Sequence, residues 1–513
     1  MLYTDNGGTR NDAPVSVTPK ISKGGKYSMK KKLLSALLST AMVASLLVGC
    51  GGDSGAATTD NSAATTDNSA AATDNTAAAT DNTASTDNTA AADNTAAADT
   101  SSDAAASGDK FYIYSWNTEL GERLEYVYKV YPEIKDRVEY VNVGDSAIYQ
   151  EKIDQLLQTP DAEDYPDMIA FEAGYIMKYT NSDYTIPVTD CGITDADLAE
   201  MYPYTITIAT DQRDGSLKGL SWQACPGSFI YRTDLAESIL GVKSPEEMQA
   251  KINSWDAFLD TAREIKEKSG DATRILSSNG DIVNTFMSNK TQPWVTSDSV
   301  FHMDPAMEEY MDVVQVLESE DLTQKTTQWS DEWNAGPSTD AVFGYFGCTW
   351  FLHWTIKANC GGDAVGSGTY GLWNMCQGPA PYYWGGTWLG ATANCSDTAL
   401  AGQIMKTLCC DTETIQTLSE ETLDYVNNKT AMKNLSDAGK GAYDFLGGQD
   451  FIAVFSPLAE DVDVSWMCAY DQKVNELLDT QVTAYARGDK DKETAIADFK
   501  AAVAEAYPAL TVE

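Results

Sequence analysis

Aromatic and glycine residues are concentrated in one stretch of the sequence, between Phe343 and Trp388. Twelve of its 46 residues are aromatic, whereas aromatic residues make up 10% of the whole chain. Aromatic faces beside glycine-rich backbone suit a flat ligand with C–H faces and a rim of hydroxyl groups, such as a neutral sugar ring. Any single ring is more often a core residue than a ligand contact. The stretch as a whole nevertheless predicts a binding site for a polyhydroxylated ligand.

The charge of the chain excludes several classes of function. The 513 residues include 35 Lys and Arg against 76 Asp and Glu, which gives a net charge of −41. Such a chain repels phosphate backbones and disfavours anionic ligands, so we expect no nucleic-acid partner and a neutral ligand. Because His302 and His353 are the only histidines, we expect neither a histidine-based metal site nor a Ser–His–Asp triad.

Nine cysteines follow Cys50, and none of them forms a C-x-x-C pair. An odd number cannot be fully paired within one chain. We interpret these cysteines as reduced and buried, acting as small apolar side chains. We therefore expect no metal site, and no cofactor.

The N-terminal part of the sequence carries targeting signals. Residues 29–49 contain three successive lysines and then an apolar run too short to span a bilayer, which predicts a secretory signal peptide. The residues that end at Cys50 (LVGC) resemble the bacterial lipoprotein box. The resemblance implies that Cys50 is acylated and anchors the protein to the outer face of the plasma membrane. We expect the bacterium to be of the Gram-positive kind. Residues 1–28 lack apolar periodicity, and we interpret them as an extension from a start codon assigned too early. Residues 50–108, which repeat Thr-Asp-Asn or Ala-Asp-Asn, predict a disordered linker.

The folded part of the chain begins near Lys110 with alternating strand and helix patterns. Strand patterns at residues 110–116, 137–143 and 167–173 are separated by helical patterns at 121–130 and 149–157. This alternation predicts an α/β fold with a parallel sheet. Further helices are predicted by apolar stripes at residues 255–265, where Ser254 is placed to cap the helix, and at 400–408, 474–485 and 496–503.

Several segments occur in an order that resembles a known family. They are residues 112–117 (YIYSWN), 166–172 (PDMIAFE), 217–222 (LKGLSW), 229–235 (FIYRTDL), 255–258 (WDAF) and 384–391 (WGGTWLGA). Behind a lipoprotein signal, this order is similar to that of the substrate-binding lipoproteins of carbohydrate ABC importers, the extracellular solute-binding proteins of the maltodextrin-binding type. The resemblance covers nearly all of residues 110–513.

The resemblance implies a two-lobed, periplasmic-binding-protein-like type II fold with a ligand cleft between the lobes. Lobe 1 would comprise residues 109–221 plus about 385–455, and lobe 2 residues 222–384 plus about 456–513. A monomeric protein without catalytic activity would capture a neutral mono- or oligosaccharide and deliver it to ABC transporter permease subunits by lobe closure. Carried over by position, the ligand contacts are Trp116, Asn117, Glu119, Glu172, Trp222, Trp350, Trp384, Gly385, Gly386 and Trp388. The carboxylates and Asn117 would bond hydroxyl groups, and the tryptophans would stack.

Three other functions remain open at this point. A polyamine or other small-solute binder of the same fold would also use aromatic rings and carboxylates, because both attract ammonium groups. A surface glycoside hydrolase would need two carboxylates at a defined separation, and an acidic sequence does not exclude such a pair. A structural surface protein is the third alternative, although it would have no obvious use for the aromatic, glycine-rich stretch.

Overall fold

The computed structural model describes residues 110–512. The predicted signal peptide, the predicted acylation site Cys50 and the predicted linker lie outside the described residues. No helix in the described part of the chain is both long and apolar enough to cross a membrane.

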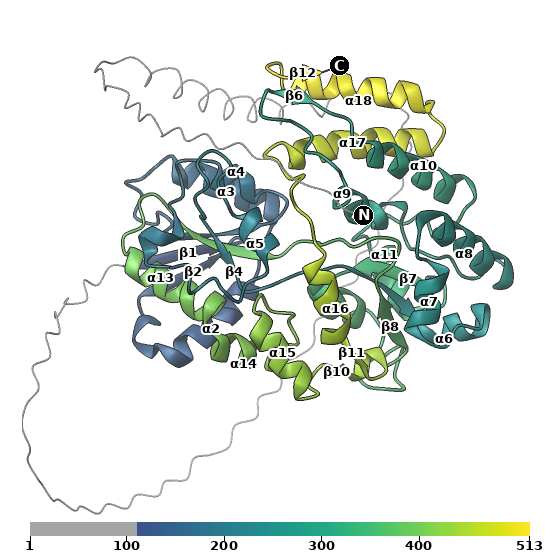
Figure 1. Cartoon of the computed structure of the whole chain (residues 1–513), viewed down its shortest axis with the longest axis horizontal. Helices are drawn as coiled ribbons and strands as arrows, with labels where there is room; N and C mark the ends of the chain where they lie inside the picture. The colour runs from purple at the N-terminus through teal and green to yellow at the C-terminus, as the bar shows by residue number, and fades with distance from the viewer. Residues whose placement is uncertain (1–109, 513) are drawn as a thin grey trace, which may run out of the picture. The chain divides into compact units, whose positions relative to one another are not determined.

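A five-stranded sheet forms the first structural unit of the described chain. Its strands follow the order β2-β1-β3-β9-β4 (Figure 1). Strand β1 pairs in parallel with both β2 and β3, whereas β9 runs antiparallel to β3 and β4. The predicted parallel α/β arrangement is therefore confirmed for the first three strands. The bounds are β1 (Phe111–Ser115), β2 (Val138–Asn142), β3 (Met168–Glu172), β4 (Leu220–Ser221) and β9 (Thr387–Ala391).

The apolar run of β3 explains its central place in this sheet. Met168, Ile169, Ala170 and Phe171 are fully buried, as expected for a parallel strand covered on both faces. Helices α2 (Glu119–Val130) and α3 (Ser146–Leu157) connect the first three strands, close to their predicted positions. Asp145 caps α3 by accepting hydrogen bonds from the first free backbone N–H groups of the helix.

A second, three-stranded sheet has β5 (Ser228–Arg232) at its centre, between β7 (Gly344–Gly347) and β8 (Trp373–Cys376). Both neighbours are antiparallel to β5. Ile230 belongs to the apolar cluster that also covers the five-stranded sheet, while Phe229 and Tyr231 point into a second cluster. Helices that surround this second cluster are α8 (Trp255–Lys268), α9 (Val283–Met287), α10 (Pro305–Ser319), α17 (Asp471–Ala486) and α18 (Lys492–Ala506). As predicted, Ser254 caps α8.

Two chain segments connect the sheets and lie side by side. The first crossing (residues 222–227) follows β4, and the return crossing (residues 377–386) precedes β9. Gly227 donates its backbone N–H to Tyr382 at 2.7 Å, and Trp384 donates its backbone N–H to Cys225 at 3.0 Å. We call the five-stranded sheet with its helices lobe 1 and the three-stranded sheet with its helices lobe 2.

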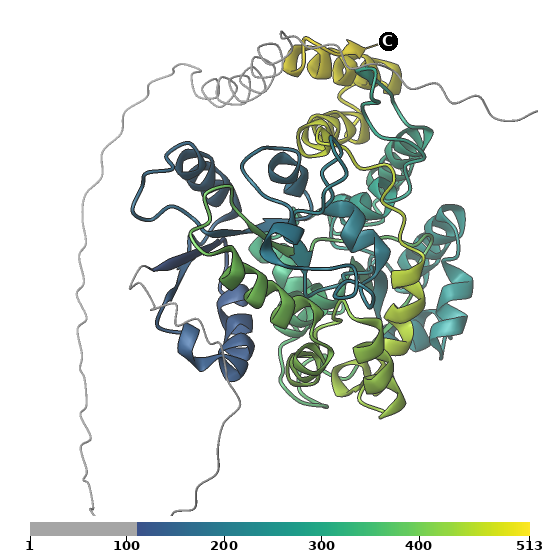
Figure 2. The same cartoon turned by 60° about the vertical axis from the view of Figure 1, so that its left-hand side comes forward.

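The segment after β9 returns first to lobe 1. Helices α13 (Thr398–Met405), α14 (Thr412–Thr422) and α15 (Lys429–Asp437) follow, and α14 packs against both α2 and α15 (Figures 1 and 2). The hairpin of β10 (Ala442–Tyr443) and β11 (Gln449–Asp450) then reaches lobe 2, because Gln449 bonds both the N–H and the carbonyl of Met375 in β8. We therefore propose that the last lobe boundary lies near residue 440 rather than 455.

The remaining elements are short or lie at the surface. They are α4 (Ile176–Thr180), α5 (Pro203–Ile208), α6 (Thr233–Leu235), α7 (Pro245–Lys251), α11 (Asp331–Ala335), α12 (Thr349–Phe351), α16 (Phe451–Glu460), β6 (Val300–Phe301) and β12 (Thr511–Val512).

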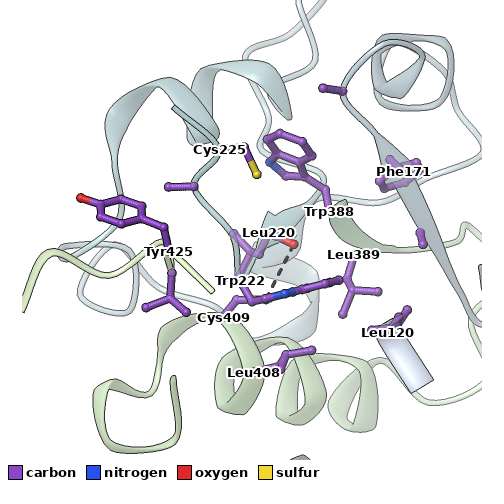
Figure 3. Packing of buried hydrophobic residues seen from close by; sticks show 14 of the residues in the cluster. Leu120, Phe171, Leu220, Trp222, Cys225, Trp388, Leu389, Leu408, Cys409 and Tyr425 are labelled. Carbon is purple, nitrogen blue, oxygen red and sulfur yellow. Dashed lines mark hydrogen bonds between the residues drawn. The ribbon is translucent and has the colours of Figure 1, made fainter. Parts of the chain in front are cut away.

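Two tryptophans form part of the core of lobe 1. Trp222 and Trp388 are 0% and 1% exposed. Figure 3 shows Trp222 between strand residues and Leu408 and Cys409, whose thiol donates to the Leu220 carbonyl. The indole of Trp388 donates to the backbone carbonyl of Thr205 at 2.9 Å. Both side chains therefore pack the core instead of facing solvent.

The cysteines of the described chain are all unpaired. Seven of the nine are buried, and Cys395 and Cys410 are partly buried. This burial fits their interpretation as small apolar side chains.

Candidate functional site

A cavity of about 790 Å³ opens where the end of β3, the return crossing and the helices of lobe 2 meet. Lobe 1 contributes residues 172–174, and the return crossing contributes residues 383–385. Lobe 2 contributes residues before and within α9, one face of α10, the loop 325–329 and one face of α17. The volume lies within the range of about 300–1,000 Å³ that small-molecule sites occupy.

Glu172 is the carboxylate at the lobe 1 end of this cavity. It is the last residue of the buried strand β3, so the strand delivers its side chain to the edge of the sheet. The carboxylate accepts a hydrogen bond from the backbone N–H of Gly174 at 2.7 Å, and no Lys or Arg within residues 110–512 forms an ion pair with it. Burial raises the pKa of Glu172 to about 7, although backbone N–H groups of Gly174 and Ala173 oppose the rise.

The return crossing places Gly385, which follows Trp384 in the chain, close to Glu172. The ring of Trp384 lies 5.1 Å from the ring of Trp350, edge to face, and the Trp350 indole donates to the Trp384 carbonyl at 3.1 Å. Gly385 has a φ of +69°, and a Cβ at this position would lie 3.1 Å from Trp350 Nε1 and 3.4 Å from Glu172 Oε1. Glycine is therefore needed here both for the left-handed backbone and for the close approach of two side chains.

Trp329 is a cavity residue that the sequence analysis missed. Its side chain is 48% exposed and its ring lies 5.8 Å from that of Trp384. Its φ of +71° is uncommon for a bulky residue, and such conformations cost on the order of 1–3 kcal/mol and cluster at functional sites. Trp329 lies outside the aromatic-rich stretch, in a loop without apolar periodicity. The only sequence signal for a role in ligand binding was therefore its residue type, tryptophan.

Side-chain amides and hydroxyls line much of the remaining wall. The side chains of Asn284, Gln472 and Thr327 make no hydrogen bond within the described chain and are free to bond a ligand. Asn475 accepts a hydrogen bond from the indole of Trp294 at 2.7 Å, which leaves its N–H groups available. Such a wall suits a ligand with many hydroxyl groups, because amides both donate and accept.

Trp466 closes one side of the cavity and is held by a buried cation. Lys290 Nζ lies 4.6 Å from the ring centroids of both Trp466 and Trp294, and it forms an ion pair with Asp471 at 3.1 Å. The Lys290 side chain is fully buried. Its charge is thus compensated by Asp471 and by two aromatic faces, and it fixes Trp466 in the wall.

Three of the expected contacts on lobe 1 lie outside the cavity lining. Trp116 packs edge to face against Tyr149 and Tyr175, with centroids 5.7 and 6.0 Å away. Asn117 accepts a hydrogen bond from the backbone N–H of Glu119 at 3.0 Å, in a turn at the start of α2. These contacts give Trp116 and Asn117 a role in positioning the loop after β1.

Glu119 belongs to a buried charge network that joins α2 to the first crossing. Gln223 donates to Glu119 at 2.6 Å, and Arg123 bonds Asp424 at 3.0 Å and lies 3.6 Å from Glu119. Burial, followed by the repulsion between the two carboxylates, raises the pKa of Glu119, and burial raises the pKa of Asp424, while Arg123 opposes both shifts. One guanidinium lies between two buried carboxylates, the network is tied to the crossing through Gln223, and none of these residues lines the cavity.

The other expected contacts divide between the cavity and the core. Glu172, Trp384 and Gly385 line the cavity, and Trp350 lies directly against Trp384. Gly386 is buried, and a Cβ on it would approach the Trp388 ring at 3.2 Å. We carry Glu172, Trp350, Trp384 and Gly385 forward as candidates, and leave out Gly386 and the core residues Trp222 and Trp388.

Within residues 110–512, no group of three or more His, Cys, Asp or Glu side chains is arranged to hold a metal ion.

Residues 133–442 match the family model described as bacterial extracellular solute-binding protein. This chain belongs to that family. Its fold is similar to that of an extracellular solute-binding protein of family 1, with a TM-score of 0.66, 18% identity and coverage of 77% of this chain and 99% of the other. It is also similar to the sugar-binding protein MalE from Xanthomonas citri, with a TM-score of 0.62, 16% identity and coverage of 77% and 97%.

A curated relative is the lactose-binding protein of Rhizobium radiobacter, which is 28% identical over 152 residues. The match covers 28% of this chain and about a third (34%) of that relative. The structural likenesses confirm the expected two-lobed, periplasmic-binding-protein-like fold of this solute-binding protein. The family and these neighbours are binding proteins.

Proposed function

We propose that this solute-binding protein captures a sugar or oligosaccharide outside the cell and delivers it to the permease subunits of an ABC transporter by closing its lobes. The names of two similar proteins, a lactose-binding protein and the sugar-binding protein MalE, support this ligand class. The net charge of −41 supports a ligand without negative charge.

One arrangement carries the proposal. Trp384 and Trp329 expose aromatic surface to a cavity whose lobe 1 end is the unpaired carboxylate of Glu172. A sugar ring stacks its C–H face on an indole, and its hydroxyl groups donate to a carboxylate at the ring edge. Amides and hydroxyls of lobe 2 then bond the opposite rim, so that the ligand connects the two lobes and favours their closed form.

The same arrangement argues for binding without a chemical step. Glycoside hydrolysis needs two carboxyl groups on opposite sides of one bond. Four further carboxylates line the wall, and three of them are ion-paired with a lysine: Asp471, Glu318 and Glu476. We propose that Glu172 acts as a hydrogen-bond acceptor, that no cofactor takes part, and that the protein acts as a monomer on the outer face of a Gram-positive plasma membrane, anchored through Cys50.

A thermal-shift screen of the purified protein against neutral oligosaccharides, amino sugars, amines and peptides tests the proposal. A ligand at 100 times its dissociation constant adds about 2.7 kcal/mol to the free energy of unfolding, which raises the melting temperature by several degrees. We expect a shift with at least one sugar and no product after long incubation. A shift with peptides alone, or release of a cleaved sugar, would contradict the proposed function.

A further inference from the structure

The charges around the cavity are unevenly distributed. Five carboxylate residues and two basic residues line it, a formal difference of three negative charges (5 − 2). The carboxylates are Glu172, Glu318, Asp471, Glu476 and Asp479, and the basic residues are Lys325 and Arg487. A cleft with an excess of one sign of charge concentrates ligands of the opposite sign.

The lysines in and behind this wall are already ion-paired with other carboxylates, and the arginine lies at the far end of α17. Lys325 forms an ion pair with Glu318 at 3.1 Å, and the buried Lys290 behind the wall is paired with Asp471. Arg487 follows the last residue of α17, which places it about 24 Å along the helix from Asp471 at 1.5 Å per residue. None of these cations pairs with Glu172 in the structure.

Glu172 therefore ends the cavity as a carboxylate without a counter-ion among residues 110–512. Its Oε2 accepts from the Gly174 N–H, and its Oε1 faces the return crossing near Gly385 and Trp350. Burial disfavours the ionised form, as the raised pKa of Glu172 shows. A hydroxyl group would relieve this cost in part by a hydrogen bond, whereas an ammonium group would donate a hydrogen bond and also compensate the negative charge of the carboxylate.

The aromatic residues beside Glu172 favour the same kind of group. Trp384 and Trp329 present rings 5.8 Å apart at this end of the cavity, and Trp is the best aromatic partner for a cation. The amides and hydroxyls farther along the wall demand a ligand that also carries hydroxyl groups, which a simple polyamine lacks.

We propose that the ligand of this protein is an amino sugar, or an oligosaccharide that contains one, whose protonated amine binds Glu172 while its ring stacks on Trp384. This inference rests on the proposed carbohydrate-binding function and refines the neutral ligand expected from the net charge. The amine donates to Glu172, the sugar face covers the indole, and the remaining hydroxyls bond the wall of lobe 2.

Isothermal titration calorimetry with matched probes tests the inference on the unmodified protein. The probes are glucosamine, N-acetylglucosamine and glucose, the corresponding galactose series, and the β-1,4-linked trimers of glucosamine, N-acetylglucosamine and glucose. We expect at least one amine to bind ten times more tightly than both its N-acetyl form and its neutral parent. Acetylation keeps the ring and removes the charge, so this comparison requires no variant.

The Glu172→Gln variant then assigns the amine to this residue. We expect its preference for the amine over the neutral parent to fall to about one, while Glu139→Gln, which removes an exposed carboxylate on the edge strand β2, keeps the preference. An unchanged preference in Glu172→Gln would overturn the assignment.

The probes also separate the inference from the proposed function. Neutral sugars that bind as tightly as the amines would overturn the inference and leave carbohydrate binding intact. Binding of spermidine without any sugar would overturn both. Absence of binding by every amino sugar would also overturn the inference, while the wider sugar panel would still decide the proposed function.

Discussion

The indole Nε1 of Trp350 donates a hydrogen bond to the backbone carbonyl of Trp384 at 3.1 Å. A side chain of lobe 2 thereby fixes the backbone of the return crossing at the residue whose ring lines the cavity. Gly385 follows with a left-handed backbone and lies close to Glu172, so this contact holds the crossing beside the carboxylate. The position of the proposed stacking surface thus depends on a contact between a lobe and a crossing.

Replacing Trp350 with Phe tests this contact. The variant keeps an aromatic ring but loses the donor, so we expect about 1 kcal/mol lower stability and a severalfold weaker sugar affinity. Urea denaturation and calorimetry would measure the two effects. A variant with normal affinity and normal stability would show that the hydrogen bond does not position Trp384.

Trp329 offers a cleaner test of stacking because its ring is half exposed and its backbone is left-handed. Glycine adopts this backbone without strain, so Trp329→Gly should fold with near-normal stability. We expect its sugar affinity to fall at least fivefold, equivalent to about 1 kcal/mol of lost stacking. Trp354→Ala, at a tryptophan that is 54% exposed and outside the cavity lining, is the matched control and should bind normally.

Replacing a core tryptophan should lower stability, in contrast to the Trp329→Gly variant. Trp388→Ala removes a fully packed ring and its hydrogen bond to Thr205, so we expect a loss of about 3–5 kcal/mol in the free energy of unfolding. Chemical denaturation would measure this loss. A stable Trp388→Ala variant with weakened sugar binding would instead show that Trp388 contributes to the ligand site.

The contrast between these tryptophans marks the limit of what the sequence could predict. The strands and helices of lobe 1 were predictable because alternation and helical spacing repeat over several residues, as in β3 and α3. Glu172 was predictable because an acidic residue follows a buried strand. Trp222 and Trp388 carry the same residue type as Trp384, and only their packing between a sheet and helices separates core from cavity.

Residues far along the chain escaped prediction for a related reason. The cavity face of α17 joins the site because this helix packs on α10, and the loop that holds Trp329 joins it through hydrogen bonds between Thr326 and Ser277. Nothing in the sequence links either segment to β3. The polar residues of α17, such as Asn475, look like an ordinary exposed helix face in sequence. Their role as lining residues becomes clear only from the tertiary structure, which places them in the same cavity as Glu172.

Carboxyl groups with raised pKa values predict how stability depends on pH, and Glu172 and Asp281 are two of them. Burial raises the pKa of Glu172 to about 7, and burial raises the pKa of Asp281 to about 7 against hydrogen bonds from Ser278, Trp333 and Gln328. In the unfolded chain both groups lose their protons near their ordinary values of 4–4.5. Between about pH 4.5 and 7 the native state therefore holds more protons, so the free energy of unfolding falls as pH rises.

Urea denaturation at pH 5, 6, 7 and 8 would measure this trend. We expect the highest stability near pH 5 and a decline that continues to about pH 8, because burial also raises the pKa of Glu119 to about 8. Asp281→Asn, which removes one of these titrating groups, should make the decline shallower. A stability that rises from pH 5 to 7, or an Asp281→Asn variant with an unchanged slope, would contradict the assignment.

The most direct test of the central claim is a crystal structure of the protein with the sugar that stabilises it most in the thermal-shift screen. The account predicts that the sugar lies between the lobes, with one ring over Trp384, a polar group on Glu172 and hydroxyl groups on the amides of lobe 2. A sugar bound elsewhere on the surface, or a cavity that stays empty at saturating sugar, would contradict it.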